Sequence, residues 1–292
     1  MSLKVLFASS EVTPFRKTGG LGDVAGALPK ALKSRGVDVR LVMPLYRGIR
    51  WDELERLDGV LDVPMYYGTA RAAVRMGNLP GSEVPIYFLE HHGYFDRPDV
   101  YGPADGSYPD NLERFAFFSR ASLELATALG FEADVVHVND WQTALIPVYL
   151  STLHRGTPLH RAATLFTIHN LAFQGVFDSG GFFVTGLGRE HYNPRELEHY
   201  GGMNLMKGAL YHATLLSTVS PTYARELQRP EHGAGLDGVI ASRSADLHGI
   251  LNGIDTEEWN PATDRHLPAG YSVADLAGKA VCKRDLQREM GL

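Results

Sequence analysis

The most constraining feature of this sequence is a repeated alternation between short, densely apolar runs and longer segments with helical periodicity. Runs of strand length occupy residues 3–8, 37–43, 135–138, 163–168, 215–219 and 248–254. Between them, apolar residues recur every three or four positions over residues 22–35, 111–129, 141–153 and 204–212, as in amphipathic helices. Strands that alternate with helices form parallel sheets through right-handed crossovers. The sequence therefore predicts an α/β fold with a doubly wound, mostly parallel, Rossmann-like sheet.

Two stretches depart from this alternation. Residues 63–67, 71–76 and 85–89 alternate apolar and polar side chains and are separated by glycines, which predicts a β-hairpin elaboration of the sheet. Residues 264–270 have the composition of a surface linker, and a helical pattern follows over 279–290. We therefore expect one domain over residues 1–262, and a linker with the start of a truncated second domain over 263–292.

Charge and composition limit the classes of partner. The net charge is -6, from 34 acidic and 28 basic residues, so bulk attraction gives no reason to expect a nucleic-acid partner. The sequence has neither an apolar run of membrane-spanning length nor a basic leader, so we expect no membrane partner. Cys282 is the single cysteine and allows no internal disulfide. These features predict a cytoplasmic protein.

Polar clusters follow four of the predicted strands. They lie at residues 17–23, 139–142, 169–170 and 252–255. In open α/β sheets, ligands bind beyond the carboxyl ends of the strands. Because four such loops share one predicted edge, we expect a binding site there.

The first of these loops is rich in glycine. Gly20 begins a match to the dinucleotide pattern G-x-G-x-x-G/A, but about ten residues separate it from the strand, and no acidic residue closes the second strand, so an NAD site is disfavoured. The loop also lacks the Gly-Lys-Ser/Thr of a phosphate-binding P-loop. Backbone N–H groups at a helix N-terminus nevertheless attract phosphate, and Gly19 and Gly20 permit close approach. Lys17 would add a mobile charge; the alternative is a glycine-rich turn with a solvated lysine.

The same loop carries a family resemblance. Its sequence "KTGGLGDV" at residues 17–24, preceded by "ASSEVTPF", resembles the signature loop of bacterial glycogen synthases and plant starch synthases. Further motifs agree in order and spacing: "YFDRPDVYG" at 94–102, "YPDNLERFAFF" at 108–118, "VVHVNDWQTAL" at 135–145, "FTIHNLAFQG" at 166–175, "NLMKGAL" at 204–210, "STVSPTYARE" at 217–226 and "GILNGIDTEEWNP" at 249–261. The resemblance covers nearly the whole chain.

The resemblance implies both a fold and an activity. These synthases have two Rossmann-like domains that face a cleft, the arrangement called GT-B, and this chain is similar to the N-terminal half. They transfer glucose from ADP-glucose to the 4-hydroxyl at the non-reducing end of an α-1,4-glucan, with retention of configuration and without a metal or other cofactor. Most of the nucleotide pocket belongs to the C-terminal domain of the same chain, whose motifs are absent here. We therefore expect this chain to be a fragment that is inactive alone.

The resemblance also assigns roles to residues. Lys17, with Gly19 and Gly20, would lie near the donor diphosphate. His169 would lie near the donor sugar, and Asp140 would bind sugar hydroxyls and orient the loop of His169. These implied catalytic residues are Lys17, Asp140 and His169. The implied substrate-binding residues are Lys17, Gly19, Gly20, Asp23, Tyr94, Tyr101, Asp140, Trp141, His169, Asn170, Asn252 and Asp255.

Several of these residues have purely structural alternatives. His169 is also compatible with a core histidine at a strand end, and Asp140 with the N-cap of a helix that begins at Trp141. Trp141 suits either a sugar face or the core, and His137 within a strand is expected to be structural. Position 142 is Gln, where the family usually has histidine; because its amide cannot titrate, we expect no acid–base role for Gln142.

Two other functions remain open from the sequence. One is a stand-alone glucan-binding module that has no partner domain. The other is a different GT-B transferase, similar to sucrose synthase, that uses UDP-glucose. The donor base is recognised outside this half of the enzyme, so the sequence does not choose between adenine and uracil.

Overall fold

The computed structural model describes residues 2–292, and the chain divides into two compact units, Met1–Leu251 and Asn252–Leu292. The strands are β1 (Lys4–Ala8), β2 (Asp38–Pro44), β3 (Glu55–Arg56), β4 (Leu61–Met65), β5 (Gly68–Asn78), β6 (Pro85–Glu90), β7 (Val135–Asn139), β8 (Ala163–Ile168), β9 (Val176–Phe177), β10 (Glu198–His199), β11 (Gly202–Asn204), β12 (Leu215–Thr218) and β13 (Leu247–Gly249). The α-helices are α1 (Gly20–Lys33), α2 (His92–Phe95), α3 (Asn111–Ala128), α4 (Leu145–Ser151), α5 (Leu205–His212), α6 (Pro221–Glu226), α7 (Asp237–Ser242) and α8 (Ala277–Glu289).

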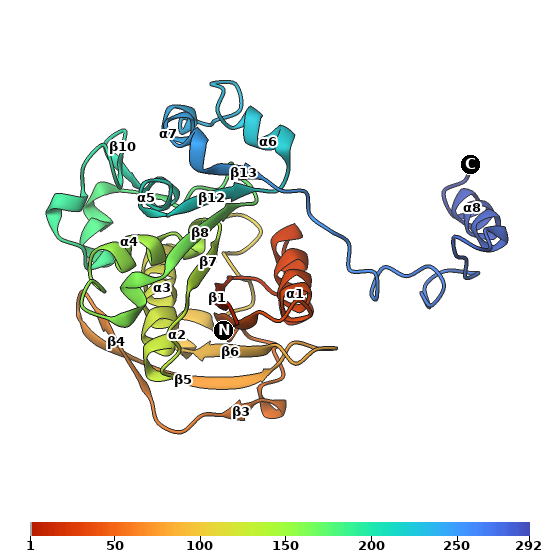
Figure 1. Cartoon of the computed structure of the whole chain (residues 1–292), viewed down its shortest axis with the longest axis horizontal. Helices are drawn as coiled ribbons and strands as arrows, with labels where there is room; N and C mark the ends of the chain where they lie inside the picture. Colours follow the sequence, from red (N-terminus) through yellow and green to blue (C-terminus); the bar gives the residue numbers. More distant parts are fainter. Residues whose placement is uncertain (1) are drawn as a thin grey trace. The chain divides into compact units, whose positions relative to one another are not determined.

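The first unit is built on a ten-stranded sheet in the order β13-β12-β8-β7-β1-β2-β6-β5-β3, with β4 paired to β5. The strands from β13 to β6 run parallel, and β5, β3 and β4 are added antiparallel at one end. Helix α1 lies on one side of the sheet and α3 and α4 lie on the other (Figure 1). A second sheet, β10-β11-β9, is small and antiparallel. The predicted α/β class and hairpin elaboration are confirmed.

The strand order reverses at β1. From β1 the chain adds β2 and β6 on one side, then crosses back to place β7, β8, β12 and β13 on the other. The loops after β1 and β7 therefore diverge from a common point at the carboxyl edge of the sheet. In doubly wound sheets this switch point is where ligands bind. Phe7 of β1 and Val138 of β7 are fully buried beneath it, so the edge rests on a rigid apolar base.

A buried arginine holds the long connection before α3. The guanidinium of Arg114 is fully buried and donates to the carbonyl oxygens of Tyr94 at 2.7 Å and Val100 at 3.0 Å, and to Oδ1 of Asn111 at 2.6 Å. These bonds offset the cost of taking a guanidinium out of water. They fix the loop that carries Tyr101, which reaches the loop after β1.

Two predicted elements differ from the structure. The helix expected over 141–153 is a 3₁₀ turn, Trp141–Thr143, followed by α4. A continuous helix from Trp141 would need an N–H from Pro147, which proline lacks. The strand expected over 248–254 ends at Gly249. An added Cβ at Gly249 would lie 2.4 Å from Cα of Pro221, so the strand packs tightly there, and from Asn252 the chain belongs to the second unit.

The second unit contains α8, which begins and ends within two residues of the helix predicted at 279–290. None of its residues is buried. The predicted domain boundary after residue 262 stays a prediction, since the division at Asn252 reflects compactness alone. No helix among residues 2–292 is long and apolar enough to cross a membrane.

Candidate active site

The loop between β1 and α1 uses its glycines in two ways. A Cβ added at Gly19 or Gly20 would meet no atom within 4 Å, so the backbone there has an open face. A Cβ at Gly22 would lie 2.5 Å from Cβ of Lys17, and one at Gly26 would lie 2.7 Å from the backbone oxygen of Thr13. The first pair therefore leaves room for a ligand, and the second pair lets the loop pack on the helix.

Lys17 and Asp23 form an ion pair across this loop. The Nζ of Lys17 lies 2.7 Å from Oδ1 of Asp23, and both side chains are about half exposed. Thr13 donates its hydroxyl to the same oxygen at 3.1 Å. An exposed pair of this kind contributes about 0–1 kcal/mol, so an incoming anion can compete for the ammonium group at small cost.

The buried side chain of Glu11 supports the loop between β1 and α1. Glu11 was not among the site residues predicted from the sequence. The residue is 3% exposed. Its Oε1 accepts from the hydroxyls of Thr18 at 2.8 Å and Tyr101 at 2.5 Å, and its Oε2 accepts from the backbone N–H groups of Thr18 and Gly19. The amide of Gly19, which we predicted to face a phosphate, is thus bonded inside the loop. No spacing rule marks Glu11; its signals are its position three residues after a buried strand and its place within the segment "ASSEVTPF".

Asn139 joins the ends of three strands. Its Nδ2 donates to the carbonyl oxygen of Ala8, the last residue of β1, at 3.0 Å. This bond fixes the amide orientation, so Oδ1 accepts from Nε2–H of His169 at 2.9 Å. Asn139 ends β7 and His169 follows β8. Asn139 was not among the predicted site residues, although its neighbour was.

Asp140 fixes the loop after β8. Its Oδ1 accepts from the backbone N–H of His169 at 2.7 Å and of Asn170 at 3.4 Å, and its own N–H donates to the oxygen of Thr167 at 3.0 Å. The side chain makes no cap bond to the turn that begins at Trp141. The N-cap alternative is therefore wrong, because the carboxylate is turned toward the neighbouring strand end.

The backbone and the charge of Asp140 are both unusual. Its φ is 55°, a left-handed conformation that costs energy in a residue with a Cβ and that is common at functional sites. Burial raises the pKa of Asp140 to about 7; the N–H groups of His169 and Asn170 oppose this rise, and the charge of Glu11 adds to it. Near neutral pH this carboxyl group is therefore poised between its two protonation states.

His169 is held as a neutral ring. Burial lowers its pKa to about 4, so the imidazole carries no charge at pH 7 and is not a general acid there. Behind it, Nε2 of His137 lies 2.7 Å from Oγ1 of Thr167, and burial lowers the pKa of His137 to about 3. His137 is a buried residue of β7, 7% exposed, in accord with the expected structural role.

The aromatic candidates are placed differently. Trp141 is 8% exposed, with its ring 5.0 Å from that of Phe115 and against the backbone of Gly175, which favours the core alternative. The hydroxyl of Tyr101 lies 2.9 Å from Oγ of Ser10 in addition to its bond with Glu11. Tyr101 therefore braces the loop after β1.

Tyr94 is buried in a separate aromatic group. Its ring stacks on that of His91 at 4.2 Å, and its hydroxyl contacts Tyr67 at 3.0 Å and the carboxylate of Glu113. Burial, followed by these hydrogen bonds, raises the pKa of Tyr94. The structure thus does not bring Tyr94 into contact with the loops after β1, β7 and β8.

The remaining candidates lie at loop ends. Asn170 is exposed, and its Oδ1 accepts from the N–H of Ala172 at 3.0 Å. Gln142 is 5% exposed. Asn252 and Asp255 belong to the second unit, where Oδ1 of Asp255 accepts from two backbone N–H groups that follow it. Of the four predicted polar loops, those after β7 and β8 are bonded to each other through Asp140 and Asn139, and Asn139 also joins them to the end of β1 at Ala8.

Comparison with known proteins identifies the family of this fold and site. The family model of the starch synthase catalytic domain matches residues 4–242. The chain belongs to this family. The chain is 54% identical over 294 residues to glycogen synthase 1 of Geobacter sulfurreducens. It is 51% identical over the same length to glycogen synthase 1 of Geobacter metallireducens. Each alignment covers 99% of this chain and 59% of the relative.

A solved structure agrees with the sequence relatives. The chain is similar to the catalytic domain of starch synthase IV from Arabidopsis thaliana bound to ADP and acarbose, with a TM-score of 0.89 and 34% sequence identity. That match covers 100% of this chain and 60% of the other. The chain thus spans about three fifths of the length of these relatives.

Proposed function

We propose that this starch synthase family chain forms the acceptor side and part of the donor site of a retaining glucosyltransferase. Its substrates would be ADP-glucose and the 4-hydroxyl at the non-reducing end of an α-1,4-glucan. The observation that carries the proposal is the junction of three strand ends, in which Asn139 and Asp140 bind His169 beside the glycine loop. The bound ADP of the Arabidopsis relative supports an adenine donor over UDP-glucose.

The diphosphate would bind at the glycine loop. Lys17 would exchange its contact with Asp23 for a phosphate oxygen, and the open face at Gly19 and Gly20 would admit the diphosphate close to the backbone. The leaving nucleoside diphosphate gains negative charge in the transition state. A donor aimed at that charge lowers the barrier, and loss of one such donor costs on the order of 100-fold in rate.

The glucosyl group would bind at His169. Because the ring is neutral and fixed by Asn139, the role that fits it is a hydrogen bond to a sugar hydroxyl, with its backbone carbonyl available to the positive charge that develops on the sugar. Asp140 would act by positioning His169, since its Oδ1 is bonded to the backbone of that loop. Asn170 is exposed beside it and is proposed as a further sugar contact.

A partner domain would complete the site. The relatives are longer than this chain, which covers 59% of their length, and we propose that their remaining length supplies most of the nucleotide pocket. Catalysis depends on surrounding the donor and excluding water. We therefore expect residues 1–292 alone to show no glucan elongation.

The test is glucan elongation by a chain extended through a second domain. Glycogen should be elongated with ADP-glucose and much more slowly with UDP-glucose, and Lys17→Ala and His169→Ala should each reduce kcat/KM on the order of 100-fold. Near-normal activity of both variants would exclude this site. A coding sequence without a second domain, together with glycogen binding by residues 1–292, would instead support a stand-alone binding module.

A further inference from the structure

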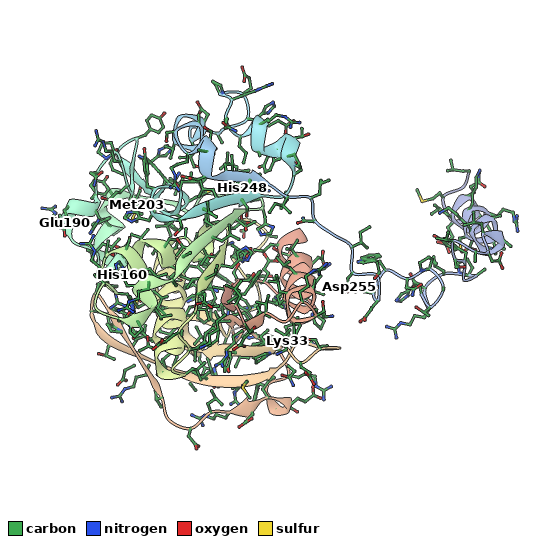
Figure 2. All side chains as sticks on the ribbon, viewed as in Figure 1. Lys33, His160, Glu190, Met203, His248 and Asp255 are labelled. Atoms are coloured by element: carbon green, nitrogen blue, oxygen red, sulfur yellow. The ribbon has the colours of Figure 1, made fainter. Side chains whose placement is uncertain are left out.

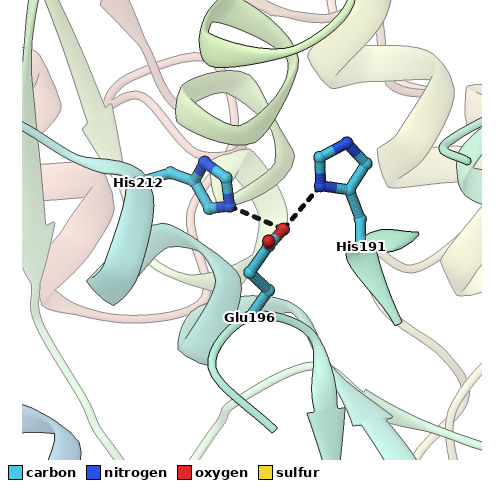
Figure 3. A group of neighbouring side chains, drawn as sticks. All are labelled: His191, Glu196 and His212. Carbon is cyan, nitrogen blue, oxygen red and sulfur yellow. Dashed lines mark hydrogen bonds and ion pairs between the residues drawn. The ribbon is translucent and has the colours of Figure 1, made fainter. Parts of the chain in front are cut away.

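We propose that His191, Glu196 and His212 form a binding site for a divalent transition metal of the zinc class. This metal site is separate from the proposed glucosyl transfer, and the metal takes no part in that reaction. His191 ends the 3₁₀ turn Arg189–His191, Glu196 lies in the loop that follows, and His212 is the last residue of α5. Figure 3 shows both imidazole rings turning a nitrogen toward one carboxylate.

The ligand atoms converge from separate segments. Nδ1 of His191 lies 2.6 Å, and Nε2 of His212 lies 3.0 Å, from Oε2 of Glu196, and the candidate ligand atoms lie within 4.8 Å of one another. Zinc binds imidazole and carboxylate at about 2.0–2.2 Å, so a rotation of the carboxylate would open room between the three atoms. Two imidazoles and a carboxylate suit zinc, copper or nickel better than magnesium or calcium.

The hydrogen bond on the far side of His212 sets its tautomer. Oγ of Ser151 donates to the carbonyl oxygen of Val148 at 3.0 Å, so it accepts from Nδ1–H of His212 at 2.6 Å. The neutral ring then presents the lone pair of Nε2 to a carboxylate oxygen. Nε2 of His212 and Oε2 of Glu196 lie 3.0 Å apart, and a cation between them would be bound by both atoms.

The surroundings resemble those of metal ligands in other proteins. A ligating histidine commonly donates its second N–H to a fixed acceptor, as His212 does to Ser151. The other oxygen of Glu196 accepts from Nδ2 of Asn193 at 3.2 Å, which orients the carboxylate. Glu190 is an exposed residue of the same 3₁₀ turn as His191 (Figure 2), and its Oε1 lies 3.9 Å from Nε2 of His191.

Metal binding would tie the loop of His191 to the end of α5. The three ligand side chains are only 14–23% exposed, so the ion would be largely enclosed and would keep water at its open coordination positions. Because the unfolded chain cannot assemble these ligands, the ion stabilises the folded state by mass action. We therefore expect a structural metal site that stabilises the folded chain.

The test uses Zn²⁺ alone with the 292-residue chain. Titration calorimetry should detect one tight site, and added Zn²⁺ should raise Tm; Co²⁺ should give the visible absorption of a low-coordinate ion. Glu196→Gln keeps an oxygen that accepts from His191 but removes the charge, so it should fold normally without metal and bind Zn²⁺ at least ~100-fold more weakly. Ser151→Ala keeps all three ligands and should weaken binding by about 10–100-fold.

His248→Ala is the matched control, since His248 is an exposed histidine of β13 (Figure 2). It should bind Zn²⁺ as the parent chain does. Equal binding by the parent chain and Glu196→Gln would place the ion elsewhere and overturn the proposal. Absence of any rise in Tm or binding heat with Zn²⁺ in the parent chain would also overturn it.

Discussion

Oδ1 of Asp140 lies 2.7 Å from the backbone nitrogen of His169, so a side chain at the end of β7 fixes the main chain at the end of β8. The bond links parallel neighbours in the sheet at the edge where ligands bind in this class of fold. A carboxylate that holds a loop in this way affects a reaction through the position of its neighbour. Its removal should therefore alter the geometry of His169 before it alters any chemistry of its own.

The raised pKa of Asp140 predicts a pH-dependent stability. The folded pKa of about 7 lies above the ordinary value of 3.8, so the folded state binds an extra proton between these values. The resulting stability is fully present below the ordinary pKa and is lost as pH rises through 7. Asp140→Asn keeps the acceptor oxygen and lacks the titration. In urea unfolding, the free energy of unfolding of the variant relative to that of the parent chain should rise between pH 4 and 8, by up to about 4 kcal/mol.

The lowered pKa values of His137 and His169 act in the opposite direction, but they are present in both proteins and cancel in this comparison. Asp58→Asn, at an exposed aspartate, is the control and should differ from the parent chain by a constant small amount. A pH-independent difference for Asp140→Asn would contradict the predicted titration.

Glu11→Gln tests the support of the glycine loop. The carboxylate accepts from two backbone N–H groups and two hydroxyls, whereas the glutamine amide has one acceptor oxygen and brings two donors that lack partners. The free energy of unfolding should fall by about 1–3 kcal/mol. Urea unfolding of Glu132→Gln, at an exposed site, provides the baseline. Equal stability of the two variants would refute the supporting role.

Alanine at two glycines separates packing from ligand approach. Gly26→Ala places a Cβ 2.7 Å from the backbone oxygen of Thr13 and should destabilise the chain by about 1–3 kcal/mol. Gly19→Ala meets no atom within 4 Å, so its unfolding curve should match that of the parent chain. In the extended enzyme, however, Gly19→Ala should raise KM for ADP-glucose. An unchanged KM would show that the donor stays away from this backbone.

Lys17→Ala should separate activity from stability. The half-exposed ion pair with Asp23 contributes about 0–1 kcal/mol, so Tm should hardly change, while kcat/KM for ADP-glucose in the extended enzyme should fall on the order of 100-fold. Lys33→Ala, near the other end of α1, is the charge-matched control and should retain full activity. A comparable loss in both variants would indicate a general charge effect.

The sequence predicted the parallel strands and three of the loops at the site, because buried strands and polar strand ends both leave a local pattern. The roles of Glu11 and Asn139 depend on contacts with Tyr101 and with Ala8, about ninety and 131 residues away in sequence. Such partners follow from strand order and register, which periodicity alone does not give. The sequence therefore predicts which edge of the sheet carries the site, but it does not identify Glu11 and Asn139, which hold the loops at that edge in place.

Local rules also explain the errors in element bounds. Apolar periodicity predicts one helix over 141–153, but Pro147 has no N–H to bond to the turn before it, and the α-helix begins only at Leu145 with Pro147 in its first turn. The apolar side chains of Ile250, Leu251 and Ile254 extended the predicted last strand, yet all three are more than 60% exposed. Their environment is set by where the chain leaves the first unit, and a window of neighbouring residues carries no information about that.

The position of β1 at the centre of the sheet has a consequence for synthesis. Strand β1 pairs on one side with β2, which follows it closely in sequence, but its other partner, β7, lies about 130 residues later. At roughly 5–20 residues per second, translation leaves that edge of β1 open for roughly 6–26 s. Long-range parallel pairing is slow to form, so the nascent half-sheet exposes an apolar edge that chaperones can recognise, and the site at the switch point is assembled only after β8 and His169 have been synthesised.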